Sequence, residues 1–287
     1  MRLDATHTTA PRGTRTPDDE QQEPPSAATL GAYGRTFVLA PAWSLLLGAE
    51  DGCLLRACVR QDCALFLQSE MQPRRSYKDW QLDVAPWLCE SARRVYETDN
   101  AGGSSLISEA MSMEMLCRAF GASLLKTEME LAYFPSESAM TDFAVEIDGV
   151  KLGVSVTRAL SHPSSQLTLD DAVRLLSKKL AGVLKSTAAC YNVGWDKQIL
   201  HIWARTLKVA RLLEQAYSMV DPLLRADTLC LVTRCSSLPE LFTEHMKPRA
   251  RPPRQLKGTK DLKHCQVLLE SDPMRNYLRV CTEFHPE

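Results

Sequence analysis

The sequence predicts an α/β protein whose mixed central sheet combines a three-strand meander with a following β-α-β unit, flanked by helices. Three observations support this prediction. Apolar and polar residues alternate along much of 123–158, which is typical of half-buried strands. An Asp-Gly dipeptide at 148–149 divides that stretch where a two-residue hairpin turn would lie. After residue 168, amphipathic helical patterns alternate with short apolar runs, as in α/β folds.

Length, composition and cysteine usage narrow the class of protein. The chain has 287 residues, 45% of them hydrophobic and 24% charged, so it is long enough to bury a large core. Its net charge of -1 creates no global field for nucleic acid or membranes, so a surface for either would have to be local. Its ten cysteines form no Cys-x-x-Cys pair. Cys53, Cys58 and Cys63 are spaced by five and would not share one helix face, so we expect them to pack as small apolar residues.

The sequence predicts neither secretion nor a membrane span. The N-terminus lacks the apolar core of a signal peptide, and no apolar run reaches the roughly 18 to 20 residues that cross a bilayer. We therefore expect an intracellular protein, nuclear or cytoplasmic, with reduced cysteines, no disulfides and no membrane partner.

Composition also divides the chain into segments. The first 34 residues are rich in Thr, Pro, Gln and charge, which is typical of disorder. A helix is expected over 84–96, with Trp80 and Trp87 as packing anchors, whereas the elements within 36–67 are left open. The expected organisation is a disordered tail (1–34), an N-terminal extension packing on the core (35–100), an α/β core (101–245), a basic Pro-rich loop (246–261) and a C-terminal segment packing on the core (262–287).

The first core elements are a helix over 104–120 and a strand over 123–134. Gly121 would end the helix, along which an apolar stripe runs, with Glu109 and Glu114 off the stripe. Alternation of apolar and polar residues indicates the strand that follows.

The next element is a β-hairpin over 141–158. Its Asp-Gly turn needs positive φ at both central residues, which Gly adopts freely, and this turn fixes the register. The expected cross-strand pairs are Glu146 with Lys151, Ala144 with Gly153, and Asp142 with Ser155. One face of the hairpin is then apolar, and the other carries the polar groups.

The second half of the core alternates helices and strands. Thr168 is a good N-cap, with acidic residues after it, for a long amphipathic helix. Two buried strands are expected over 198–204 and 228–233, and an amphipathic helix over 206–219 lies between them.

The order helix, strand, hairpin, helix, strand over about 104–204 resembles the PD-(D/E)XK nuclease superfamily, with Glu109 on the first helix and Asp142 opening the hairpin. The resemblance implies a restriction-endonuclease-like core and metal-dependent phosphodiester hydrolysis, in which carboxylates hold Mg²⁺. Carried over by position, Asp142 and Glu109 are the expected metal ligands.

The third motif of that superfamily, an acid-x-Lys triplet on the next strand, is replaced here. Ser155 and Thr157 stand at its two functional positions, so hydroxyls take the place of a carboxylate and a lysine. The expected catalytic residues are Asp142, Glu109, Ser155 and Thr157. Glu128 or Glu130 remains an alternative carboxylate, and the substitutes for the missing cation are Lys178, Lys179 or Arg158.

Two functions follow as expectations. In the first, the protein is nuclease-like and acts on or binds DNA or RNA, as a Mg²⁺-dependent nuclease if active; its nucleic-acid-binding residues are Arg158, Lys178, Lys179, Arg249, Arg251 and Arg254. In the second, it is an inactive pseudo-nuclease that serves as a scaffold for a protein partner. The motifs of dinucleotide-binding folds, P-loops, zincins and α/β-hydrolases are absent from the sequence.

Overall fold

The structure is a computed structural model that describes residues 35–39, 43–61, 63–73, 85, 88–99, 105–160, 166–195 and 197–243, and every structural statement below concerns these. The expected tail 1–34, the basic loop 246–261, the C-terminal segment 262–287, and Trp80 and Trp87 lie outside the described residues.

A single mixed sheet of eight strands forms the centre, in the order β1-β2-β3-β8-β7-β6-β5-β4. The neighbours β3, β8, β7 and β6 are parallel, and the remaining pairs are antiparallel. This confirms the predicted α/β class, the meander and the following β-α-β unit. The strands are β1 (Arg35–Leu39), β2 (Trp43–Leu47), β3 (Leu65–Pro73), β4 (Ser123–Thr127), β5 (Phe143–Ile147), β6 (Val150–Arg158), β7 (Lys197–Ala204) and β8 (Thr228–Arg234).

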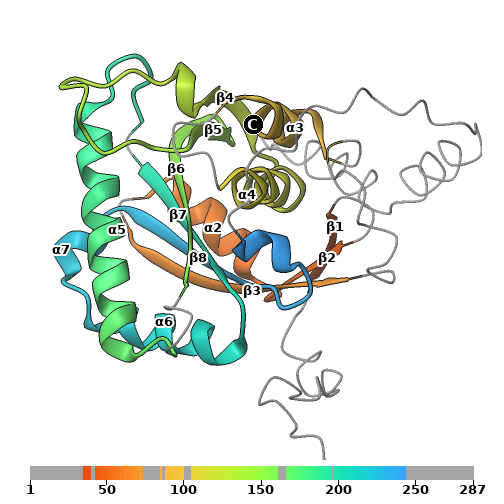
Figure 1. Cartoon of the computed structure of the whole chain (residues 1–287). Coiled ribbons are helices and arrows are strands. Elements are labelled where there is room, and N and C mark those ends of the chain that lie inside the picture. Colours follow the sequence, from red (N-terminus) through yellow and green to blue (C-terminus); the bar gives the residue numbers. More distant parts are fainter. Residues whose placement is uncertain are drawn as a thin grey trace, which may run out of the picture.

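Helices cover both faces of the sheet (Figure 1). On one face, α2 and α4 share a core with β1, β2 and the neighbouring strands, and α3 packs against α4. On the other face, α5 and α6 pack on β7 and β8. The helices are α2 (Asp51–Val59), α3 (Glu90–Glu97), α4 (Leu106–Phe120), α5 (Leu169–Ala189), α6 (Leu207–Met219) and the short α7 (Pro222–Arg225), and the 3-10 helices are η3 (Glu128–Glu130) and η4 (Pro239–Phe242).

The hairpin β5–β6 has the predicted turn and register. Asp148 and Gly149 have φ values of 51° and 80°, as the type I′ turn requires. Ile147 pairs with Val150, and the ladder continues as predicted to Ala144 with Gly153. The turn is also anchored from outside the hairpin, because Arg56 of α2 donates to both carboxylate oxygens of Asp148, at 2.9 and 3.1 Å.

Helix α4 confirms the predicted span and its end. Gly121 adopts the left-handed conformation with φ 71°, and its N–H donates to the carbonyl of Cys117 at 3.1 Å. The helix is buried almost all round because α3 packs against it, so Glu109 and Glu114, which lie off the apolar stripe, are only 3% and 0% exposed.

Three element predictions need correction. The strand expected over 123–134 ends at Thr127, because Thr127 and Glu130 form a capping box that starts η3 instead. The helix expected over 84–96 begins only at Glu90, after Cys89 as N-cap.

The third correction concerns Gln72 and Pro73. The Pro and Arg residues of 72–76 predict a linker there, but Gln72 and Pro73 are the last two residues of β3, and 74–76 lie outside the described residues. The segment expected to extend the core, 35–100, supplies β1, β2 and β3 to the same sheet, where β3 pairs in parallel with β8.

Two further expectations concern cysteines and membranes. All eight cysteines of the described residues are free thiols. No helix in the described part of the chain is long and apolar enough to span a bilayer.

Candidate functional site

The sheet topology brings several polar residues to one edge. Strands β4, β6, β7 and β8 all run in the same direction, so their carboxyl ends meet there, together with the start of the antiparallel β5. Asp142 directly precedes β5, Glu128 directly follows β4, and Arg158 ends β6. In open α/β sheets this edge is where ligands bind.

Asp142 is fixed against β6 by its own hydrogen bonds. Its N–H donates to the carbonyl of Val154 at 3.1 Å, and its carboxylate Oδ2 accepts from the N–H of Val156 at 2.6 Å. A short charge-assisted bond of this kind holds the carboxylate in one orientation. Asp142 therefore lies alongside β6 between the positions of Ser155 and Thr157, as the predicted register requires.

The Asp142 carboxyl lies among other charges. Burial raises its pKa well above the usual range, and the charge of Glu109 raises it further. The Val156 N–H opposes this rise, Glu128 adds to it, and the Lys179 ammonium lowers it. These effects place Glu109, Glu128 and Lys179 around Asp142, on three different elements.

Each neighbour is brought to the edge by its own element. Glu109 lies in the first turn of α4, which runs back to β4 through the tight turn at Gly121, so the start of the helix lies at the carboxyl end of β4. Lys179 lies in the middle of α5 and is half-buried, whereas Lys178 beside it is exposed. The structure thus places Lys179, and not Lys178, near Asp142.

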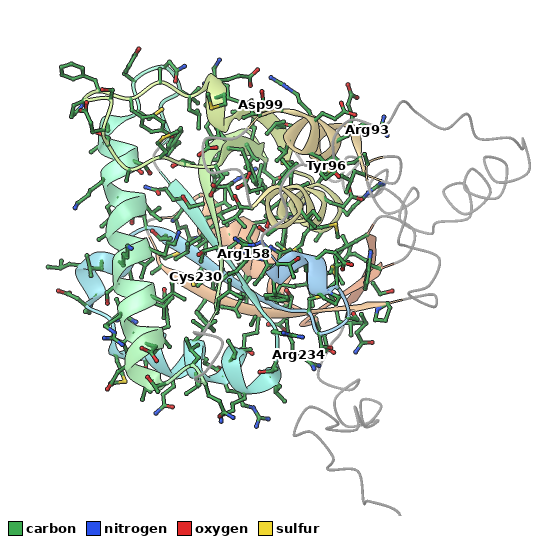
Figure 2. All side chains as sticks on the ribbon, viewed as in Figure 1. Arg93, Tyr96, Asp99, Arg158, Cys230 and Arg234 are labelled. Carbon is green, nitrogen blue, oxygen red and sulfur yellow. The ribbon has the colours of Figure 1, made fainter. Side chains whose placement is uncertain are left out.

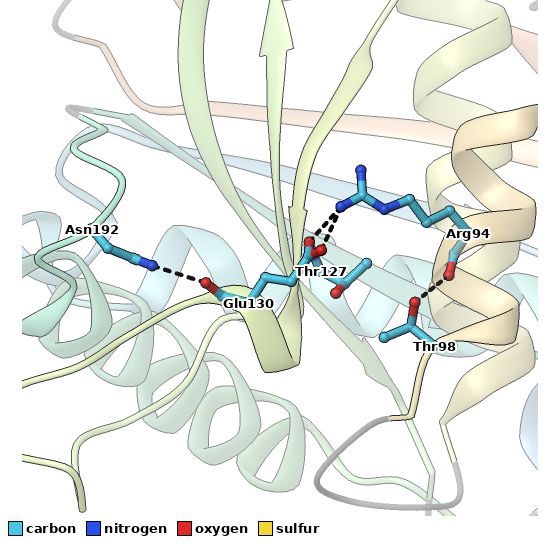
Figure 3. Close-up of polar contacts among 5 residues, drawn as sticks. All are labelled: Arg94, Thr98, Thr127, Glu130 and Asn192. Carbon is cyan, nitrogen blue, oxygen red and sulfur yellow. Dashed lines mark hydrogen bonds and ion pairs between the residues drawn. The ribbon is translucent and has the colours of Figure 1, made fainter.

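Glu130 is directed elsewhere. Its carboxylate accepts two hydrogen bonds from Arg94 of α3, at 2.5 and 2.7 Å, and one from the Thr127 N–H at 2.8 Å (Figure 3). Asn192 holds the Glu130 carbonyl at 2.8 Å. The Thr127 N–H and Arg94 also lower the pKa of Glu130. Glu130 therefore has a structural role: its carboxylate links η3 to α3, and its carbonyl links η3 to the chain after α5.

The hydroxyls predicted in the third motif lie on β6. Val156 between them belongs to the core on the α4 side, so by strand alternation Ser155 and Thr157 face the α5 side, and both are half-buried. Their cross-strand partners on β7, Leu200 and Ile202, belong to the core on that side.

Arg158, like Lys178 and Lys179, lies within the residues that the structure describes, whereas the basic loop does not. Arg158 donates from Nη1 to the carbonyl of Thr243 at 3.0 Å, and Arg234 at the end of β8 pairs with Glu70 of β3 (Figure 2). The predicted nucleic-acid-binding residues Arg249, Arg251 and Arg254 lie outside the described residues.

One site residue is missing from the sequence-based prediction. The phenolic oxygen of Tyr133 accepts the N–H of Thr141 at 2.9 Å, one residue before Asp142. Burial raises the pKa of Tyr133, and the charge of Asp142 is among the smaller contributions. Tyr133 fits the expected strand alternation, so no sequence signal distinguishes it; only the loop between η3 and β5 brings it to the site.

The carboxylates do not form a closed protein cage for a metal. Among the described residues, no three His, Cys, Asp or Glu side chains are grouped so that they could hold a metal ion. What the edge offers is a half-buried Asp142 whose pKa is raised by the charges of Glu109 and Glu128 and lowered by the Lys179 ammonium.

The structure thus defines an α/β fold with a mixed sheet, with Asp142, Glu109 and Glu128 near its carboxyl edge. The chain is similar to the AAC-rich mRNA clone AAC4 protein of Dictyostelium discoideum, with 40% identity over an alignment of 214 residues that covers 72% of this chain. The matched region spans 30% of that relative's length, and the relative's name states no activity. No known protein family and no solved structure matches the chain.

Proposed function

We propose that the chain is a nuclease-like protein of the PD-(D/E)XK type, whose Asp142 and Glu109 hold a divalent cation at the carboxyl edge of the sheet, where nucleic acid binds. The observation that carries the proposal is the position of Asp142 at the carboxyl edge of the sheet, where its carboxylate accepts the Val156 N–H at 2.6 Å between the two third-motif positions. Burial and the neighbouring charge of Glu109 raise the pKa of Asp142, and carboxylates with a perturbed pKa are concentrated at functional sites.

The donor set suits Mg²⁺ rather than a metal that needs a complete protein cage. Mg²⁺ is commonly held by one or two carboxylates and completes its shell with water and substrate phosphates. Asp142 and Glu109 supply that minimum, and Glu128 lies close enough to Asp142 to affect its pKa. When bound, the cation would supply charge stabilisation at a phosphodiester.

The chain's own residues would orient the phosphate. The Val156 N–H keeps Asp142 in place, and the Ser155 and Thr157 hydroxyls on either side of it are hydrogen-bond donors. The Lys179 ammonium lowers the pKa of Asp142, so Lys179 would take the place of the missing motif lysine. Arg158 and Lys178 extend the positive charge along the backbone of a bound strand, together with Arg249, Arg251 and Arg254 of the basic segment.

The test measures cation binding and nucleic-acid binding separately. Calorimetric titration with Mn²⁺ and Mg²⁺ is expected to show one site in the wild type and its loss in Asp142→Asn and Glu109→Gln. Glu146→Gln is the matched control, because Glu146 lies on the same strand but pairs with Lys151. Cleavage and salt-dependent binding are then measured with single- and double-stranded DNA and RNA. A wild type without cation binding and without salt-sensitive nucleic-acid binding would refute the proposal.

A second candidate function is a pseudo-nuclease scaffold for a protein partner. The observation in its favour is that the third-motif positions carry Ser155 and Thr157 and that the described residues form no three-ligand group. A scaffold predicts that Asp142→Asn changes neither cation binding nor nucleic-acid binding. Cation binding that is lost in this variant would exclude the scaffold as the explanation for the acidic cluster.

A further inference from the structure

Two thiols meet where α3 packs against α4. Cys89 is the N-cap of α3, and Cys117 lies near the end of α4. Both are half-buried and contact the edge of the core, so they stay within reach of small solutes. The two side chains lie close together, because the Cys89 N–H bonds Glu114 one turn before Cys117 and because each thiol has the largest effect on the pKa of the other.

The Glu114 carboxylate links the start of α3 to the last turns of α4. Glu114 lies one turn before Cys117 on α4, and its Oε2 accepts the Cys89 N–H at 2.7 Å. Its other oxygen accepts from Nε of Arg118 at 3.0 Å. The Cys89 sulfur also accepts from the N–H of Ala92 at 3.5 Å, as a helix cap. Glu114 is fully buried, so this contact ties the start of α3 to the turn of α4 that carries Cys117.

The two thiols differ in acidity. The side-chain contact with Cys89 lowers the pKa of Cys117 to about 7, against the effects of burial and of Glu114, and the charge of Arg118 lowers it further. The same contact, together with burial, raises the pKa of Cys89. The thiolate is the reactive form of cysteine, so Cys117 is the nucleophile of the pair.

We propose that Cys89 and Cys117 form a peroxide-sensitive dithiol, in which Cys117 reacts with the oxidant and Cys89 then closes a disulfide between α3 and α4. The Cys117 thiolate attacks one oxygen of hydrogen peroxide, the O–O bond breaks, and hydroxide leaves, which produces a sulfenic acid. Cys89 then loses its proton and attacks the Cys117 sulfur, the S–O bond breaks, and the released hydroxide takes up a proton as water. Two thiols are oxidised and one peroxide is reduced to two waters.

A second cysteine pair in the same molecule is the internal control. Cys58 and Cys63 of the α2 region are also neighbours, with the Cys63 thiol donating to the Cys58 carbonyl at 3.9 Å, but burial and the side-chain contact with Cys63 raise the pKa of Cys58 to about 11. At pH 7 the thiolate fraction of Cys58 is far smaller than that of Cys117. Since nucleophilicity falls as pKa falls, part of this difference cancels, and Cys117 should react on the order of a hundredfold faster.

The experiment treats the purified full-length chain with rising hydrogen peroxide, alkylates the remaining thiols and maps the peptides by mass spectrometry. The expected product is a peptide pair linked through Cys89 and Cys117 that dithiothreitol separates, at peroxide levels that leave Cys58 alkylated. Separate alkylation of Cys89 and Cys117 throughout, or earlier linkage of Cys58 to Cys63, would overturn the proposal.

Variants test the two roles. In Cys89→Ser, the sulfenic acid on Cys117 is expected to persist and to be trapped by dimedone, whereas Cys117→Ser is expected to leave Cys89 unoxidised. Cys58→Ser is the matched control and should form the same disulfide as the wild type. Trapping on Cys89 instead of Cys117 would reverse the assignment and contradict the proposal. The wild-type peptide map gives a result even where a variant folds poorly.

Discussion

Two buried polar regions of this protein differ in how their groups are partnered. Between α4 and the sheet, both ring nitrogens of His201 have partners, Nδ1 with the Ser112 hydroxyl at 2.7 Å and Nε2 with the Thr233 hydroxyl at 2.8 Å. Thr233 continues to Ser69 at 2.7 Å. At the carboxyl edge, by contrast, the Asp142 carboxylate accepts the Val156 N–H at 2.6 Å, while the charges of Glu109 and Glu128 oppose its ionisation and Lys179 favours it.

The difference separates a structural site from a functional one. The His201 network is neutral, enclosed and satisfied at the histidine, which is how cores accommodate polar groups. At Asp142 the nearby carboxylates disfavour ionisation, and perturbed carboxylates of this kind are concentrated at functional sites. Substitutions in the His201 network should therefore lower stability the most. Removing the charge of Asp142 should instead raise stability.

The strongest test of the network is Trp203→Ala. Trp203 is fully buried, and its indole Nε1 donates to the Ser108 carbonyl at 3.1 Å and to the Ser112 hydroxyl at 3.0 Å. Removing it leaves a large cavity and should lower the free energy of unfolding by about 3 to 5 kcal/mol in denaturant titrations. Tyr191→Ala, an aromatic residue that is 70% exposed, is the control and should change stability by less than about 0.5 kcal/mol.

The next test is the acid dependence of stability through His201. Burial lowers the pKa of His201 to about 3, so the unfolded chain binds a proton at this histidine between about pH 6.5 and pH 3 and the folded chain does not. Stability is therefore lost as the pH falls. Between pH 7 and pH 4 the wild type should lose about 3 kcal/mol more than His201→Gln. Parallel pH profiles of the two proteins would show that His201 is not held neutral by the fold.

The smallest effect on stability, and one of opposite sign, is expected for the substitution of Asp142. The pKa of Asp142 is raised in the folded state, so Asp142 favours folding at low pH and its contribution is lost as the pH rises through that pKa. Asp142→Asn can still accept the Val156 N–H and should be more stable than the wild type at pH 8 without divalent cations, as measured by denaturant titration. Glu146→Gln should show no such gain. A less stable Asp142→Asn would mean that the carboxylate is structural.

The sequence predicts those features of the fold that depend on residues close together along the chain. The Asp148-Gly149 turn, the end of α4 at Gly121 and the Thr168 cap of α5 follow from short-range rules, and all three are observed. The placement of Asp142 opposite β6 follows from the turn, because a two-residue hairpin leaves only one register.

What the sequence does not reveal depends on distant contacts. Short apolar runs before residue 73 suit helix and strand equally, and it is the pairing with β2 and with the distant β8 that makes β3 a strand. Glu109 and Glu114 are polar in pattern, yet α3 packing against α4 buries them. Likewise, the contact of Cys89 with Cys117 joins two helices and has no spacing signature. Tertiary packing, which periodicity does not encode, decides each of these cases.

The position of β8 also has a consequence for synthesis. Among the described residues it is the last strand along the chain, but it lies inside the sheet, between β3 and β7. A chain that has emerged from the ribosome only as far as residue 227 therefore carries two separate part-sheets, each with an unpaired edge that can pair with another chain. The final strand joins these edges, so completion of the fold waits for the last described strand.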